Sequence, residues 1–284
     1  MAFDPARIPG KLKEAYLTNR CAILVGAGAS AGAGLPLWGK LLDDMVKAAL
    51  AYGVIAPEKA IQYRQLATKP DKYLMVASGL KDDLRIYFDE FIETTFITPK
   101  PAPTELHKAI VALDKLQFVL TTNYDTIIER ACRVNNPDVS VCTFKDTGEI
   151  QRRLSKREFF ILKAHGDATK VANGIILTDA DYRDLLFRQR GYQSLLSAMF
   201  TMFTIVFVGA SMTDPEILLL LNYIADAFTP SSGPSHFAAM AQEDITDVEK
   251  ERWFKDFNIQ LIPVSKANDY AELTEFLVAL KAVV

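Results

Sequence analysis

The sequence is poor in the side chains that most often build a metal site or a disulfide framework. Its 284 residues include three cysteines (Cys21, Cys132 and Cys142) and three histidines. No two cysteines form a Cys-x-x-Cys pair, which excludes a zinc ribbon built within this chain. The same scarcity argues against a disulfide framework. We therefore predict a protein without a bound metal.

A large net charge and a long apolar run are also lacking. The 32 basic and 35 acidic side chains leave a formal net charge of −3, so we do not expect direct nucleic-acid binding through the overall field. The longest apolar stretch, residues 198–209, is interrupted by Thr201 and Thr204 and is too short to cross a bilayer. Residues 1–7 lack the basic-then-apolar order of a signal peptide. We expect a cytoplasmic protein with no membrane contact.

What the sequence does contain is a regular alternation of two patterns. Half of its residues are hydrophobic and 24% are charged, as in ordinary globular proteins. Short apolar runs rich in β-branched residues alternate with segments of helical periodicity, which is typical of parallel strands covered on both faces. We predict an α/β fold, a Rossmann-like parallel sheet with helices on both faces. The predicted strands are 21–25, 117–121, 139–144, 159–163, 205–208, 236–240 and 259–264, and the predicted helices include 124–133, 179–188, 215–228 and 270–282.

One stretch breaks this alternation. Residues 38–96 show only helical periodicity, and a turn-rich segment with three prolines follows at 98–104. We interpret the chain as a single domain over residues 1–284 with a helical insertion at 38–104. The alternative is that these helices simply cover one face of the sheet.

A glycine-rich loop follows the first predicted strand directly. Residues 26–36 have the sequence Gly-Ala-Gly-Ala-Ser-Ala-Gly-Ala-Gly-Leu-Pro. Glycines let backbone amides approach a phosphate, and a helix N-terminus behind the loop favours a pyrophosphate. The alternative is a tight strand-to-helix turn in which small residues serve packing. A dehydrogenase would have a third glycine at position 31 and, further along, a strand that ends in an acidic residue. Ala31 stands at the glycine position, and Asp43 and Asp44 lie in a helical pattern, so the sequence disfavours a hydride-transferring dehydrogenase.

A second glycine loop repeats this arrangement later in the chain. Residues 207–215 have the sequence Phe-Val-Gly-Ala-Ser-Met-Thr-Asp-Pro, which is a strand, a turn and the start of a helix. In an open α/β sheet this loop would lie at the carboxyl ends of the strands, where ligands bind. The alternative is a capped helix start with no further role.

Polar side chains follow two other predicted strands. Asn123 and Asp125 come after the strand 117–121, and His165 with Gly166 follows the strand 159–163. The asparagine and the aspartate could merely cap the next helix, whereas a histidine before a glycine at the end of a buried strand is a good candidate for a site. His107 and His236 are interpreted as structural.

Taken in order, these motifs resemble the sirtuin family, whose members use NAD. The matching segments are Gly26–Ser30 with Gly34–Pro36, Thr122–Asp125, His165–Gly166 and Gly209–Ser211, and Pro103–His107 is similar to the family's segment ahead of the second strand. The resemblance covers roughly residues 15–265.

The sequence departs from the protein deacylases of the family in two places. Residues 168–178 contain no cysteine where the deacylases carry a four-cysteine zinc module, and the first loop continues as Gly-Leu-Pro-Leu-Trp rather than Gly-Ile-Pro-Asp-Phe-Arg. The phrase Gly-Ala-Ser-Met-Thr-Asp-Pro at 209–215 is instead similar to sirtuin-like domains of bacterial anti-phage systems. We therefore expect no zinc module.

The resemblance implies a role for each motif. Asn123 would hold the nicotinamide ribose and a water, His165 would be the general base, and Asp125 would bind the carboxamide. Nicotinamide leaves as a neutral molecule, so the reaction needs orientation, stabilisation of an oxocarbenium-like centre and a base rather than a general acid. The residues expected to bind NAD are Gly26, Ala27, Gly28, Ser30, Gly34, Pro36, Thr122, Gly209, Ser211 and Asp214.

The implied activity is hydrolysis of NAD, as substrate, to nicotinamide and ADP-ribose, which would deplete NAD in phage-infected cells. Two alternatives stay open: a non-catalytic module that binds NAD or ADP-ribose, and an NAD-dependent protein deacylase, which the missing zinc module disfavours. An unregulated NAD hydrolase would kill its host, and no part of the sequence is left over for a sensor domain. By resemblance we therefore expect a homo-oligomer and a HerA-like hexameric ATPase partner.

Overall fold

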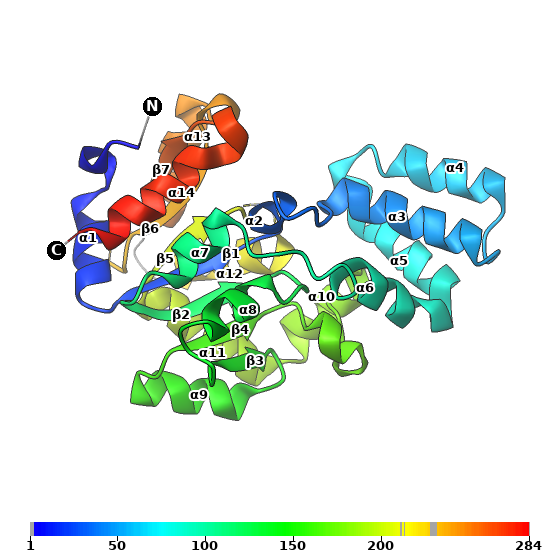
Figure 1. Cartoon of the computed structure of the whole chain (residues 1–284), viewed down its shortest axis with the longest axis horizontal. Helices are drawn as coiled ribbons and strands as arrows, with labels where there is room; N and C mark the ends of the chain where they lie inside the picture. Colours follow the sequence, from blue (N-terminus) through cyan, green and yellow to red (C-terminus); the bar gives the residue numbers. More distant parts are fainter. Residues whose placement is uncertain (1–2, 211, 213, 228–231, 284) are drawn as a thin grey trace.

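The computed structural model describes residues 3–210, 212, 214–227 and 232–283, and its centre is one seven-stranded sheet (Figure 1). The strand order is β3-β4-β2-β1-β5-β6-β7, and every adjacent pair is parallel. The predicted parallel sheet is therefore confirmed. Its strands are β1 (Cys21–Val25), β2 (Leu116–Thr121), β3 (Ser140–Thr143), β4 (Phe160–Lys163), β5 (Thr204–Val208), β6 (His236–Ala241) and β7 (Ile259–Val264).

Helices cover both faces of the sheet, as predicted. One face packs on α1 (Gly10–Leu17), α7 (Glu105–Val111), α8 (Ile127–Arg133) and α14 (Ala267–Lys281). The other packs on α9 (Thr147–Lys156), α10 (Asp179–Phe187), α11 (Arg190–Met202), α12 (Pro215–Ala227) and α13 (Asp247–Phe257). Alternate residues of one strand serve opposite faces: Ile23 and Val25 belong to the first core, and Ala22 and Leu24 to the second. This is why the strands are apolar without interruption.

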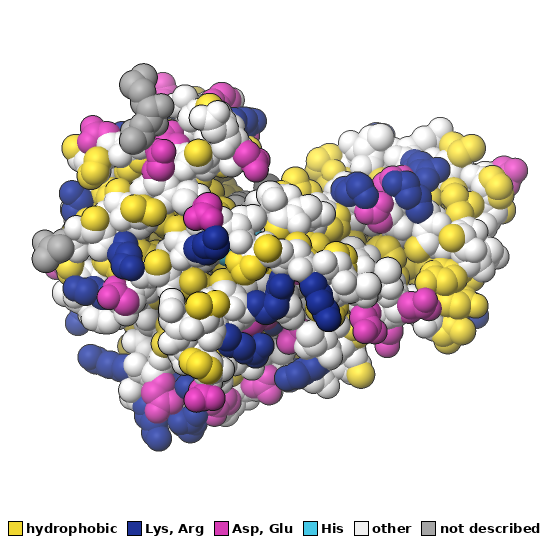
Figure 2. Space-filling view, in the orientation of Figure 1, with side chains coloured by type: hydrophobic (Ala, Val, Ile, Leu, Met, Phe, Trp, Pro, Cys, Tyr) yellow, Lys and Arg dark blue, Asp and Glu magenta, His cyan; other side chains and the backbone are white. Residues whose placement is uncertain are grey.

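Four helices form a lobe beside the sheet, which Figure 1 shows at the right of the molecule. They are α3 (Trp38–Ala51), α4 (Pro57–Leu66), α5 (Tyr73–Leu84) and α6 (Phe88–Phe96). Their apolar core continues into the sheet body through Tyr124, Ile127 and Ile175. Figure 2 shows a notch where the lobe meets the rest of the molecule, with basic and acidic side chains interspersed over the visible face. An insertion bounded at 38–104 stays a prediction.

Two helices begin differently from the pattern in the sequence. The predicted helix 124–133 starts only at Ile127, because the Asp125 carboxylate accepts a hydrogen bond from the Ile127 amide and turns the chain first. The last helix opens with a left-handed turn in which Asn268 and Tyr270 have φ of 53° and 59°. The short helices are α2 (Gly28–Ala31) and the 3₁₀ turns Pro5–Arg7, Pro70–Lys72, Arg85–Tyr87, Ala168–Asn173 and Gln242–Asp244.

None of the described helices combines the length and the apolar character that a bilayer crossing requires. The three cysteines are buried free thiols.

Candidate active site

The two glycine loops meet at the carboxyl ends of β1 and β5 and are pressed against each other. The Gly26 amide donates to the Val208 carbonyl at 3.1 Å, and the Gly28 amide donates to the Gly209 carbonyl at 2.8 Å. A Cβ added to Gly26 would lie 2.4 Å from the Cα of Ala210, and one added to Gly28 would lie 2.8 Å from the Gly209 oxygen. No other residue type permits this approach of two backbones.

This contact changes the interpretation of the first loop. The amides of Gly26 and Gly28 are already bonded to protein, and the helix behind the loop, α2, is four residues long. A single turn carries little of a helix dipole. In this arrangement the glycines allow one loop to pack on the other, which was the alternative in the sequence, and their role in binding NAD stays a prediction.

Three side chains from two loops form a hydrogen-bonded group beside the glycines. Asn123 donates through Nδ2 to Ser30 Oγ and to the Gly26 carbonyl, both at 3.1 Å. Ser30 Oγ in turn donates to Asp125 Oδ2 at 2.9 Å. These bonds fix the Asn123 amide so that its Oδ1 is buried without a hydrogen-bond partner among the described residues. A buried free acceptor at this place is suited to a hydroxyl group or a water.

His107 lies under this group, although the sequence offered only a structural role for it. Its Nδ1 accepts hydrogen bonds from the Thr104 amide and hydroxyl at 3.3 and 2.7 Å, and its Nε2 is 3.4 Å from Ser30 Oγ. Burial lowers the pKa of His107, so the ring is neutral at physiological pH with its proton on Nε2. The spacing from Thr104 to His107, a helix cap followed by its third helical residue, was the available signal.

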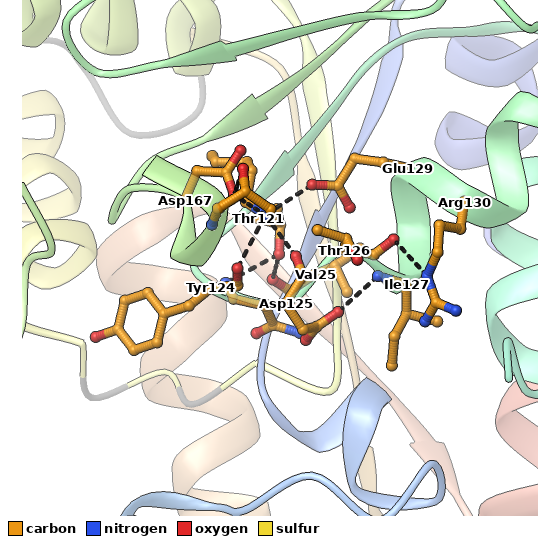
Figure 3. Close-up of polar contacts among 12 residues, drawn as sticks. Val25, Thr121, Tyr124, Asp125, Thr126, Ile127, Glu129, Arg130 and Asp167 are labelled. Carbon is orange, nitrogen blue, oxygen red and sulfur yellow. Dashed lines mark hydrogen bonds and ion pairs between the residues drawn. The ribbon is translucent and has the colours of Figure 1, made fainter. Parts of the chain in front are cut away.

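A fully buried lysine holds the Asn123–Asp125 loop from below. Lys163 Nζ donates to the carbonyls of Tyr124 and Asp125 and to Glu129 Oε1 at 2.7 Å. It also lies 3.5 Å from Asp167 Oδ1. Figure 3 labels Tyr124, Asp125, Glu129 and Asp167 among these polar contacts. Because an unpaired buried charge is costly, these contacts tie the ends of β2 and β4 together.

His165 faces two carboxylates from the start of α12. Its Nε2 is 3.4 Å from Glu216 Oε2 and 3.8 Å from Asp214 Oδ2, and neither approach has the geometry of a hydrogen bond. Burial by itself lowers the pKa of His165, but the charges of Asp214 and Glu216 outweigh it and raise that pKa above its ordinary value. Burial raises the pKa of the Glu216 carboxyl, because it disfavours the charged form. The two carboxylates thus stabilise the protonated form of the ring.

Of these groups, Ser30, Asn123, Asp125, His165 and Asp214 line one cavity of about 60 Å³ at the carboxyl edge of the sheet. It contains eight residues singled out in the sequence: Ala27, Ser30, Pro36, Thr122, Asn123, Asp125, His165 and Asp214. Larger neighbouring hollows of about 680 and 900 Å³ are both lined by Gly28 and Gly209, and the larger also by Gly26. Gly34 lines none of these three and adopts φ of +86° in a turn. Ser211 lies outside the described residues.

The donor set does not suggest a metal. Within the described part of the chain, no three His, Cys, Asp or Glu side chains are grouped so that they could hold an ion. His236, the remaining histidine, accepts a hydrogen bond from the Ile205 amide at 3.1 Å and is buried in the core, which agrees with its structural interpretation.

An open parallel sheet with glycine loops and polar strand ends at one carboxyl edge has the architecture of the doubly wound α/β proteins. A family model described as the SIR2-like domain matches residues 117–262, which is just over half of the chain. The chain belongs to this family.

Sequence comparison identifies several curated relatives of this chain. It is 27% identical over 280 residues to the NAD(+) hydrolase ThsA of Bacillus cereus, covering 92% of this chain and 54% of the relative. ThsA of Enterococcus faecium is 26% identical, with 95% and 57% covered. The defense-associated sirtuin 2 of Bacillus subtilis is 28% identical over 219 residues, with 75% and 20% covered. The chain thus spans about half the length of the hydrolases that it matches, and a fifth of the sirtuin.

Proposed function

We propose that this protein is an NAD+ hydrolase that releases nicotinamide and ADP-ribose as part of a defence against phage. The observation that carries the proposal is the buried, unpartnered Oδ1 of Asn123, on a side chain that lines the same cavity as His165. Groups left without partners at a strand-end cavity are suited to a substrate rather than to the fold. The names of the two ThsA relatives support this reaction class.

We propose distinct roles for the two residues. Since the amide nitrogen of Asn123 is already used, its Oδ1 is left to accept a hydrogen bond from a ribose hydroxyl or from the attacking water. His165, in its neutral form, is placed to take the proton. Together they would orient and deprotonate the nucleophile while neutral nicotinamide departs.

Asp125 has a more structural position than expected. Its two oxygens accept from the Ile127 amide and from Ser30, so its first task is to shape the loop. Each carboxylate oxygen can accept a second hydrogen bond, and we propose that Asp125 Oδ2 also takes one from the nicotinamide carboxamide. The NAD-binding roles of Gly26, Ala27, Gly28, Gly34, Pro36, Thr122 and Gly209 stay proposals as well, and Ser211 stays a sequence prediction.

The test is incubation with NAD alone, with and without an acyl-lysine peptide, followed by measurement of free nicotinamide. We expect release without the peptide, and loss of more than about a hundredfold of the rate in Asn123→Ala and in His165→Ala. The exposed Asn135→Ala is the matched control and should keep full activity. Release only with the peptide would indicate a deacylase, and binding without release would indicate a regulatory module.

We also propose a homo-oligomer in the cytoplasm with a HerA-like ATPase as partner, as the sequence resemblance implies. Light scattering of the purified chain, alone and mixed with such an ATPase, tests both statements. A monomer that ignores the ATPase would refute them.

A further inference from the structure

Glu216 is a buried carboxylate that takes no part in the proposed reaction as described above. It lies in the first turn of α12 and is fully buried. Its Oε1 accepts a hydrogen bond from Gln193 Nε2 at 2.7 Å, whereas its Oε2 has no partner among the described residues. The nearest cationic group is His165, whose Nε2 is equally unpartnered and lies 3.4 Å away.

We propose that Glu216 is a positioning residue for His165: its free oxygen accepts the Nε2 proton, holds the ring, and leaves Nδ1 as the basic nitrogen. The proposal rests on the proposed function for the use of that base, but the pairing itself does not depend on NAD. When the proton of an imidazole is fixed on one nitrogen by a carboxylate, the other nitrogen becomes the acceptor. A proton taken from water or from a hydroxyl would then reside on Nδ1.

Asp214 is the competing partner, and its contacts argue against it. Its Oδ2 accepts from the Tyr182 hydroxyl at 2.9 Å, and its Oδ1 accepts from the amides of Glu216 and Ile217 at 3.0 and 3.3 Å. Both oxygens are therefore engaged in starting α12 and anchoring α10. Asp214 also lies farther from the ring, at 3.8 Å. It contributes charge, but each of its oxygens already accepts a hydrogen bond, whereas Glu216 Oε2 accepts none from the described residues.

Other groups around the ring do not supply a second base. From α10 the Tyr182 ring packs edge-on against His165 at 5.3 Å, and from α11 the buried hydroxyl of Tyr192 interacts with Glu216. Burial raises the pKa of both phenols, which stay neutral. Across the cavity lie Asp125 and the uncharged Asn123. Glu216 is thus the closest group that can carry a compensating negative charge.

The direct test follows the histidines by NMR in the protein without NAD. The chain has three, so single replacements assign each signal. In the wild type we expect the ¹⁵N shifts of neutral His165 to report a proton on Nε2. In Glu216→Gln, which keeps an oxygen for Gln193, the pKa of His165 should fall by about one unit or more. The matched control is Glu129→Gln, a buried glutamate paired with Lys163, which should leave that pKa in place.

Each outcome decides the pairing. A proton on Nδ1 of the wild-type ring, or an unchanged His165 pKa in Glu216→Gln, overturns it. The wild-type measurement holds even where the variant does not fold. In parallel, the acidic limb of the pH profile for NAD cleavage should move down with the pKa in Glu216→Gln and not in Glu129→Gln. If the wild type releases no nicotinamide while the NMR results stand, the proposed function fails and the pairing survives.

Discussion

The glycine loops and the polar strand ends meet at one edge of the sheet, yet they are built in opposite ways. The loops after β1 and β5 are joined by backbone hydrogen bonds between Gly26, Gly28 and their counterparts near Gly209. The ends of β2 and β4 are joined by side chains, with Lys163 at the centre. The two glycine loops can approach each other because glycine has no side chain. The ends of β2 and β4 are held together by buried charged groups.

This difference separates scaffold from chemistry. Backbone contacts without side chains leave nothing to titrate, so the glycine loops can shape a cavity but cannot move a proton. The polar ends retain buried atoms that the fold does not satisfy, on Asn123 and His165. Unsatisfied buried groups cost stability and persist where they are used. The comparison therefore predicts that replacements in the two regions fail for different reasons.

The largest loss of stability is expected from Lys163→Met. It removes the buried ammonium and leaves the Glu129 carboxylate unpaired, which should cost about 3–5 kcal/mol of the free energy of unfolding. Denaturant unfolding measures this loss. Adding Glu129→Gln to Lys163→Met should recover part of it, because the orphaned charge is then gone. A double variant no more stable than Lys163→Met would show that the charge pair is not what joins the strand ends.

The next effect is expected in the glycine loops, from Gly26→Ala. A Cβ there meets the Ala210 backbone at 2.4 Å, so one loop must shift, at a cost of about 3 kcal/mol. The control is Gly148→Ala in α9, where a Cβ meets nothing within 4 Å and the helix gains up to about 1 kcal/mol. Thermal melts of the two variants show whether Gly26 is needed for the packing of the loops or only for binding. Equal stability of both would refute the packing interpretation.

A smaller loss of stability is expected at acidic pH, from His236, which lies outside both regions. Burial lowers the pKa of His236 to about 4, below its unfolded value near 6.5. A depressed histidine pKa means that the unfolded chain takes up the proton first, so stability falls as pH drops below 6.5. By pH 5 the loss should be about 2 kcal/mol. Denaturant unfolding of wild type and His236→Gln from pH 7 to 5 should show a shallower decline in the variant, and parallel curves would contradict this.

The smallest effect is expected from chelation. The carboxylates of the polar ends are engaged with Lys163, Ser30 and helix amides, and the part of the chain that is described has no group suited to an ion. EDTA should therefore leave the melting temperature and NAD cleavage unchanged. A drop in either would mean that the polar ends are joined by a metal as well as by the lysine.

The order of elements was predictable from the sequence, because a buried parallel strand needs an unbroken apolar run and its covering helix needs a periodic one. All seven strands fall within two residues of their predicted bounds. Eight residues of the cavity could also be named, since the carboxyl ends of parallel strands meet at one edge, but its apolar lining from the helical lobe, Trp38, Leu41 and Phe96, could not.

Pairing across the chain was not predictable. No local sequence pattern predicts that Lys163 pairs with Glu129, or that His165 lies beside Glu216. Buried charges and orphaned atoms exist only once distant segments have excluded water from the same place. For this protein the sequence alone therefore determined the architecture and the chemical types at the site. The tertiary structure decided which polar atoms and charges of the site face each other, because such contacts depend on packing rather than on local sequence pattern.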